Sequence, residues 1–163
     1  LMAATFTPLT QAETLWLSQQ LSAAEALTAA HCPEAVGKAL SPAILDRVWA
    51  AWVASEPSSP DAINAGINAI GIAFGAHLVQ QSGFSWVIAS DEWGTDLAVL
   101  ALPGTADVLV YPANFVAKRW GSRETGFLQP AFQDITRRVT TLATPDTASP
   151  AKRSFWQRLT GGV

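Results

Sequence analysis

Three acidic residues lie close together near the middle of the sequence. Asp91, Glu92 and Asp96 fall within six residues, and carboxylate oxygens are the ligands that Ca²⁺ and Mg²⁺ prefer. The spacing differs from that of a calcium-binding loop, and acidic residues also favour turns, where they accept backbone hydrogen bonds. We therefore expect a turn at this point, with no metal site and no cofactor.

Two histidines and one cysteine are the other candidates for acid–base or nucleophilic chemistry. His77 lies on a stripe of small residues in a predicted helix, where a structural histidine is more common than a general base. His31 and Cys32 adjoin at a predicted helix C-terminus, where the helix dipole disfavours a thiolate. The sequence therefore leaves enzymatic activity open, with His77, Asp91 and Glu92 as an alternative site.

A cluster of basic and aromatic residues follows at Lys118, Arg119, Trp120 and Arg123. Cations beside an aromatic ring suit either nucleic acid or an acidic protein. Phosphate contacts dominate nucleic-acid affinity, and a protein with a pI near 5.2 is poorly suited to make them. We therefore expect no nucleic acid here, and either a protein partner or a solvated surface.

Two further groups of aromatic residues are candidates for protein binding. Trp93 lies in the predicted turn at 91–94, where little of the chain can cover a large ring, so it is a candidate interface anchor. Phe155 and Trp156 belong to a short basic amphipathic segment that follows a Thr-, Pro- and Ser-rich stretch. Such a segment suits a partner protein, a membrane surface or the chain's own domain.

The composition is typical of one folded domain. The 163 residues are 49% hydrophobic and include seven tryptophans, while only 14% are charged. The net charge of −3 is unevenly distributed, because residues 1–117 hold ten acidic and two basic side chains, and residues 118–163 hold three and eight. Such a split can orient weak self-association, although the two surfaces can also neutralise one another in the fold.

The expected location is the cytoplasm. A single cysteine excludes an internal disulfide, and the N-terminus lacks a basic region followed by an apolar stretch. The longest apolar run, residues 65–79, is interrupted by polar residues and is shorter than the roughly 20 residues that cross a bilayer. We therefore expect no transmembrane segment.

Helices are predicted for the N-terminal half of the domain. The first begins at Thr7-Pro8, or alternatively at Thr10 with Glu13 as a capping box, and reaches His31. Ser41-Pro42 begins the second, and Ser59-Pro60 begins the third, over residues 61–82. In the third helix, large apolar residues share one face, which we expect to lie against a single face of the sheet: Ile63, Ile67, Ile70, Phe74 and Leu78.

A sheet and two further helices are predicted after this. Residues 84–89, 95–102 and 107–111 are rich in β-branched and aromatic side chains, and turns this short allow only antiparallel pairing. Helices follow from Pro112 and over 128–142. The predicted class is α+β, with three N-terminal helices, a three-stranded antiparallel meander and two C-terminal helices. The domain spans residues 1–143, and residues 144–163 form a linker and a basic tail.

One block of the chain combines several of these features in a fixed order. It contains Gly71-Ile72-Ala73-Phe74-Gly75, Trp86, Asp91-Glu92-Trp93-Gly94, Tyr111-Pro112 and Lys118-Arg119. This order resembles a family of small bacterial domains of unknown function, over roughly residues 60–135. The resemblance implies the fold and a bacterial origin, and it implies no activity.

Two functional hypotheses follow from the sequence. The first is a non-enzymatic protein-binding or regulatory module that uses Trp93, the basic cluster and the tail. The alternative is a small enzyme or small-ligand binder with a site between the helix at 61–82 and the sheet, where a pocket would bring His77 and a carboxylate together.

Overall fold

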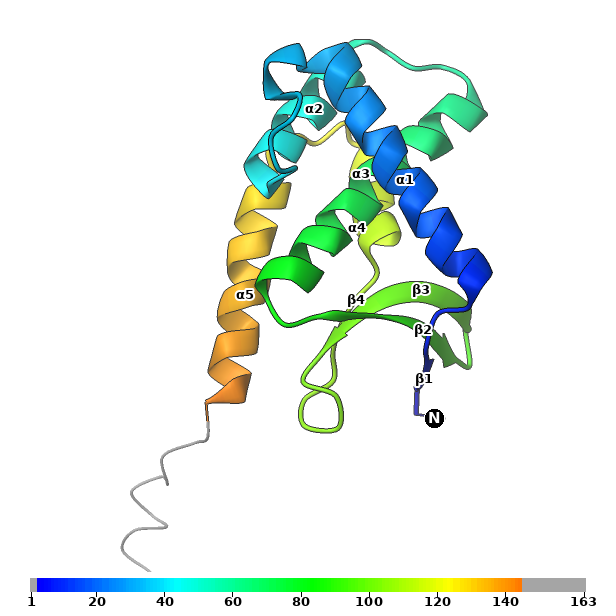
Figure 1. Cartoon of the computed structure of the whole chain (residues 1–163), viewed down its shortest axis with the longest axis vertical. Coiled ribbons are helices and arrows are strands. Elements are labelled where there is room, and N and C mark those ends of the chain that lie inside the picture. Colours follow the sequence, from blue (N-terminus) through cyan, green and yellow to red (C-terminus); the bar gives the residue numbers. More distant parts are fainter. Residues whose placement is uncertain (1–2, 145–163) are drawn as a thin grey trace, which may run out of the picture.

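The computed structural model describes residues 3–144 and has the expected α+β class (Figure 1). The predicted tail, with Phe155 and Trp156, lies outside the described residues. The described elements are β1 (Thr5–Thr7), α1 (Gln11–His31), a short 3-10 helix η1 (Pro33–Ala35), α2 (Pro42–Ala54), α3 (Pro60–Gln81), β2 (Ser85–Asp91), β3 (Gly94–Ala101), β4 (Val108–Val110), α4 (Pro112–Trp120) and α5 (Leu128–Ala143).

The N-terminal helices begin at capping residues. The start predicted at Thr7-Pro8 is wrong and the alternative is confirmed, because Thr10 and Glu13 exchange both hydrogen bonds of a capping box. Ser41 and Ser59 accept hydrogen bonds from backbone N–H groups in the first turns of α2 and α3, as their Ser-Pro pairs predict.

The sheet contains four antiparallel strands in the order β1-β2-β3-β4, one more than predicted. The extra strand, β1, is only three residues long and pairs Phe6 with Ala89 at the edge of the sheet. A strand this short carries little periodicity, so its conformation depends on the partner strand. The predicted hairpin is confirmed, since Asp91 pairs with Gly94 across the two turn residues.

Helix α3 forms the centre of the core. Four residues of the predicted apolar face are buried: Ile67, Ile70, Phe74 and Leu78. The fifth, Ile63 in the first turn of α3, is half-buried. The packing of the helix differs from the prediction, because α3 makes its most extensive contacts with α1 and α4 and only smaller ones with the sheet. Figure 1 shows α3 among the other helices, which lie over one side of the sheet.

Length and composition alone would allow α3, among the described residues, to cross a membrane. Ten residues of α3, all between Gly66 and Leu78, are buried within this fold. Burial among helices accounts for an apolar sequence of this length in a core helix.

Glycines in α3 allow other elements to approach its backbone closely. A Cβ atom at Gly71 would lie 2.7 Å from the Cα of Ala113, at the start of α4. One at Gly75 would lie 2.5 Å from the Trp86 ring of β2. The close contacts offset the cost of glycine in a helix, and they hold α4 and β2 directly against α3.

A carboxylate from α2 caps the N-terminus of α5. Phe127 occupies the cap position and has no side-chain acceptor. The two carboxylate oxygens of Asp46 instead accept hydrogen bonds from the N–H groups of Leu128 and Gln129, at 2.8 and 2.9 Å.

We expect Asp46→Ala to lower the free energy of unfolding, measured by urea denaturation, by about 2 kcal/mol. Asp134→Ala is the control, because its exposed pair with Arg137 is worth about 0.5 kcal/mol or less. Equal effects of the two variants would contradict this role of Asp46.

Candidate functional site

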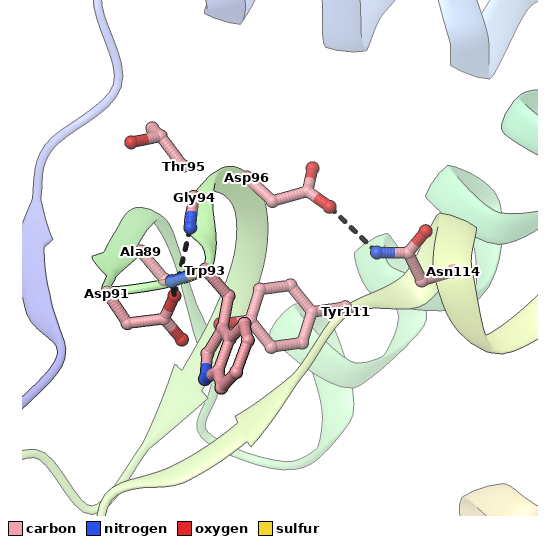
Figure 2. A pocket seen from close by; sticks show the side chains of 8 residues that line it. All are labelled: Ala89, Asp91, Trp93, Gly94, Thr95, Asp96, Tyr111 and Asn114. Atoms are coloured by element: carbon pink, nitrogen blue, oxygen red, sulfur yellow. Dashed lines mark hydrogen bonds between the residues drawn. The ribbon is translucent and has the colours of Figure 1, made fainter. Parts of the chain in front are cut away.

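A hollow of about 280 Å³ lies at the tip of the β2–β3 hairpin (Figure 2). Strand β2, the turn and β3 form one wall, and the chain entering α4 forms the other. We call it the hairpin-tip hollow, and its lining consists of Ala89, Asp91, Trp93, Gly94, Thr95, Asp96, Tyr111 and Asn114.

The strand register brings these residues together. Ala89 pairs with Asp96, and residues directly opposite one another on antiparallel strands point to the same face. Strand β4 pairs with β3 only over Val99–Ala101, so the chain leaves the sheet after Val110. Tyr111 and the first turn of α4 therefore lie beside the unpaired part of β3, where Asn114 Nδ2 donates to Asp96 Oδ2 at 2.8 Å.

Asp91 holds the turn in shape with one of its two carboxylate oxygens. Its Oδ1 accepts hydrogen bonds from the N–H groups of Trp93 and Gly94, at 2.8 and 3.2 Å. Gly94 has φ +144°, which an L-residue rarely adopts. Among the described residues, Asp91 Oδ2 accepts no hydrogen bond, so it can accept one from a bound group.

Trp93 extends from the turn into solvent. Its side chain is 88% exposed, the most of any large hydrophobic residue in the described part of the chain. Trp93, Tyr111 and Asp91 all line the hairpin-tip hollow, as the sticks in Figure 2 show. The fold gains almost nothing from a tryptophan in this position, whereas such rings frequently anchor interfaces.

The pKa of Tyr111 is raised by its surroundings in the hollow. Burial, followed by the negative charges of Asp91 and Asp96, raises the pKa of its phenol above the ordinary value of about 10. It is the only tyrosine in the chain, so near-ultraviolet absorbance reports its ionisation alone.

We expect Asp91→Asn and Asp96→Asn each to lower the pH at which half of the Tyr111 phenol is ionised. The physical reason is that each variant removes a negative charge that opposes the phenolate.

Asp107→Asn is the matched control for that titration. Asp107 caps the β3–β4 connection through Gly104 N–H and does not line the hollow. Its replacement is expected to leave the Tyr111 midpoint unchanged. A midpoint that responds equally to all three asparagine variants would show that Tyr111 does not face Asp91 and Asp96.

His77 lies apart from the hairpin-tip hollow. It lines a different hollow of about 210 Å³ between α1 and α3, together with Glu25. Its ring packs edge-to-face on Phe132, with 4.8 Å between the ring centroids, and burial lowers its pKa. The predicted alternative site joined His77 to Asp91 and Glu92. The structure places His77 and Asp91 around two separate hollows, and Glu92 lines neither of them.

The alternative hypothesis also placed a small-ligand site between α3 and the sheet, where side chains pack closely. Trp86 packs against Gly75 there, and Ala69 and Ala73 are buried. The carboxylate that does share a hollow with His77, Glu25, was not predicted. It lies on a helix far from His77 in the sequence, and only the packing of α1 on α3 brings the two together.

Two arginines of the predicted basic cluster lie over aromatic rings of the same chain. The guanidinium of Arg119 lies 4.1 Å from the centroid of the Phe115 ring, and that of Arg123 lies 3.5 Å from Trp120. Both also donate hydrogen bonds to backbone carbonyls, at Phe115 and Trp120 respectively. Lys118 is exposed. Arg119 and Arg123 thus stabilise α4 and its connection to α5.

The three acidic residues of the hairpin are not grouped together in the structure. Within residues 3–144, no three His, Cys, Asp or Glu side chains are grouped as metal ligands. Asp91 and Asp96 instead combine with Tyr111 and Asn114, which the sequence did not indicate as site residues. The strand that ends at Tyr111-Pro112 was predicted, but its register against β3 was not, and the register determines what Tyr111 faces.

Comparison with known protein families gives one match. The family model described as Domain of unknown function (DUF3806) matches residues 42–132, more than half of the chain. The chain belongs to this family, and the predicted membership of an uncharacterised domain family is confirmed. The match includes every residue of the hairpin-tip hollow. Searches among curated proteins and among solved structures give no match.

Proposed function

We propose that this member of the DUF3806 family is a non-enzymatic protein-binding module that receives a basic side chain of its partner in the hairpin-tip hollow. The observation that carries the proposal is Trp93, 88% exposed beside Asp91 in a turn that Asp91 itself holds in shape. The hydrogen bonds from Trp93 and Gly94 N–H to Asp91 hold the backbone of the turn, which lowers the backbone entropy lost on binding.

The lining of the hollow determines the chemistry of the ligand. Asp91 and Asp96 supply negative charge, while Trp93 and Tyr111 supply aromatic rings. A cation is attracted to the face of an aromatic ring and to carboxylate oxygens, so one lysine or arginine side chain can use both kinds of group. Arginine fits best, because its planar guanidinium can stack on a ring and donate to a carboxylate together.

The same charges disfavour other classes of ligand. Phosphate groups would be repelled by Asp91 and Asp96, which argues against nucleic acid at this site. The charge of the ligand should instead match that of the hollow, as it does across protein interfaces. Binding of this kind weakens as salt screens the exposed charges.

Calorimetry with a matched pair of peptides tests the proposal. One peptide is Gly-Ser-Arg-Ser-Gly with blocked ends, and the other carries citrulline, which has the shape of arginine without its charge. We expect the arginine peptide to bind the full chain about tenfold more tightly, a difference of about 1.4 kcal/mol. Equal affinity for the two peptides would refute recognition of a cation.

Variants of the protein locate the binding site. Trp93→Ala and Asp91→Asn are expected to weaken binding of the arginine peptide about tenfold. Leu15→Ala is the control, because Leu15 is also a large exposed hydrophobic residue and lies on α1, outside the hollow. Loss of binding in Leu15→Ala, or full binding in Trp93→Ala, would place the peptide elsewhere.

A further inference from the structure

The hollow that His77 lines, between α1 and α3, combines a few polar side chains with apolar walls. We call it the α1–α3 hollow, and its volume is about 210 Å³. Glu25 of α1 and both His77 and Gln80 of α3 supply its polar side chains. The rest of the lining is aliphatic and consists of Leu21, Ala39, Leu40, Ala73 and Ala76. A small number of polar groups on apolar walls is typical of a site for a small molecule.

The ring nitrogens of His77 are free to bind a ligand. The ring is half-buried and packs on Phe132, and neither nitrogen forms a hydrogen bond within residues 3–144. No side-chain nitrogen or oxygen in this part of the chain is both buried and without a hydrogen-bond partner. Both nitrogens of His77 are therefore open to solvent. Burial lowers the pKa of the imidazole, so at neutral pH the ring is mostly uncharged and one nitrogen accepts a hydrogen bond.

Glu25 supplies a negative charge to the same hollow. Its side chain is exposed on α1, and none of the ion pairs in the described part of the chain includes it. Lys38 lines an adjoining hollow of about 390 Å³, which also contains Glu25, and the two side chains form no ion pair there. The Glu25 carboxylate can therefore accept hydrogen bonds from a bound cation.

These polar groups favour a ligand that donates several hydrogen bonds. A carboxylate accepts, and so does the free nitrogen of a neutral imidazole. A protonated primary amine carries three N–H donors and a positive charge, so it can bond to both groups at once. A ligand carboxylate would be repelled by Glu25. The aliphatic walls, with Leu21 and Leu40, favour an alkyl group on the remainder of the ligand.

We propose that the α1–α3 hollow binds a small alkyl primary amine. The ammonium donates to the Glu25 carboxylate and to the His77 ring, and the alkyl group contacts Leu21 and Leu40. This site is independent of the hairpin-tip hollow, because the two hollows share no lining residue.

Titration of the full chain with three matched compounds, followed by NMR, tests the proposal. Isopentylamine carries the ammonium, while isopentyl alcohol and isocaproate carry a neutral hydroxyl and a carboxylate on the same alkyl group. We expect the amine to shift the His77 ring signals and to bind about tenfold more tightly than the alcohol. His31 is the only other histidine and is an internal reference. Equal affinity for the amine and the alcohol, or binding of isocaproate, would overturn the proposal.

A variant without the charge of Glu25 tests where the ammonium binds. Glu25→Gln keeps the shape of the side chain, and we expect it to weaken binding of isopentylamine about tenfold. Glu92→Gln is the same change at an exposed glutamate that lines neither hollow, and it is expected to leave the affinity unchanged. Equal affinities of the two variants for the amine would refute an ammonium site at Glu25.

His77→Phe tests the second hydrogen-bond acceptor. Phenylalanine keeps an aromatic ring beside Phe132 and removes both ring nitrogens. We expect binding of isopentylamine to weaken several-fold, while the amide signals of the sheet stay in place and show that the variant is folded. Unchanged affinity in a folded variant would exclude His77 from the site.

Two further measurements separate this site from other modes of amine binding. Asp91→Asn is expected to leave the affinity for isopentylamine unchanged, and a tenfold loss would place the amine in the hairpin-tip hollow. A blocked Gly-Ser-Lys-Ser-Gly peptide presents the same ammonium from a protein side chain. We expect it to shift the His77 ring signals less than isopentylamine does. Tighter binding of this peptide at His77 would overturn the assignment to a small molecule.

Discussion

Replacement of Trp49 by alanine is expected to lower the free energy of unfolding by about 4 kcal/mol, because truncation of a buried aromatic residue costs about 3–5 kcal/mol. Trp49 is fully buried on α2. Its ring lies 5.2 Å from Trp52 and 5.9 Å from Phe127, measured between centroids. The indole N–H also donates to the Glu124 carbonyl at 2.8 Å, which leaves that acceptor without its partner in the variant.

This one residue connects α2 with the chain between α4 and α5, so its loss affects several elements together. Domains have a total stability of about 5–15 kcal/mol, and the variant is therefore expected to lose a large fraction of it. Urea denaturation with an unchanged m-value is the measurement. Trp93→Ala removes the same side chain from an exposed position and is the matched control, with an effect within about 0.5 kcal/mol. Equal losses in both variants would contradict the described core.

Gly71→Ala is expected to lower the free energy of unfolding by about 1–3 kcal/mol through overpacking. In an exposed helix the same change would increase stability by up to about 1 kcal/mol. The added Cβ would lie 2.7 Å from the Cα of Ala113 and 2.9 Å from the Pro112 carbonyl oxygen. These are backbone atoms, so no side-chain rotation relieves the contact and α4 must move.

Gly121→Ala is the matched control for this second prediction. Gly121 has helical backbone angles at the end of α4, and an added Cβ would meet no atom within 4 Å apart from its own local backbone and chain neighbours. Its replacement is expected to be neutral or to stabilise the protein by a few tenths of a kcal/mol. A stable Gly71→Ala variant would show that α3 and α4 are farther apart than described.

Much of the fold follows from local sequence signals. The Ser-Pro pairs at Ser41 and Ser59 determine where α2 and α3 begin, because a hydroxyl acceptor and a fixed φ both favour a first helical turn. The hairpin at Asp91 and Gly94 follows from a side-chain acceptor and a glycine. These interactions involve residues within three positions of one another, so periodicity and capping rules are sufficient to predict them.

The unpredicted features depend on contacts between distant residues. Strand β1 exists because Phe6 pairs with Ala89, and α5 is capped by Asp46, 82 residues before Leu128. The hairpin-tip hollow combines a predicted turn with Tyr111, whose position depends on the pairing of β3 with β4. Sequence reasoning therefore identified Trp93 and Asp91, and it could not identify what faces them.

The most direct test of cation recognition follows the tryptophan indole N–H signals of the full chain by NMR during addition of the arginine peptide. The chain contains seven tryptophans, and six of them act as internal references for Trp93. The proposed site predicts that the Trp93 indole shifts together with the backbone amides of Asp91, Thr95 and Asp96, and that the citrulline peptide has little effect. Shifts that exclude Trp93, or that are equal for the two peptides, would contradict the proposal that the hairpin-tip hollow binds a basic side chain.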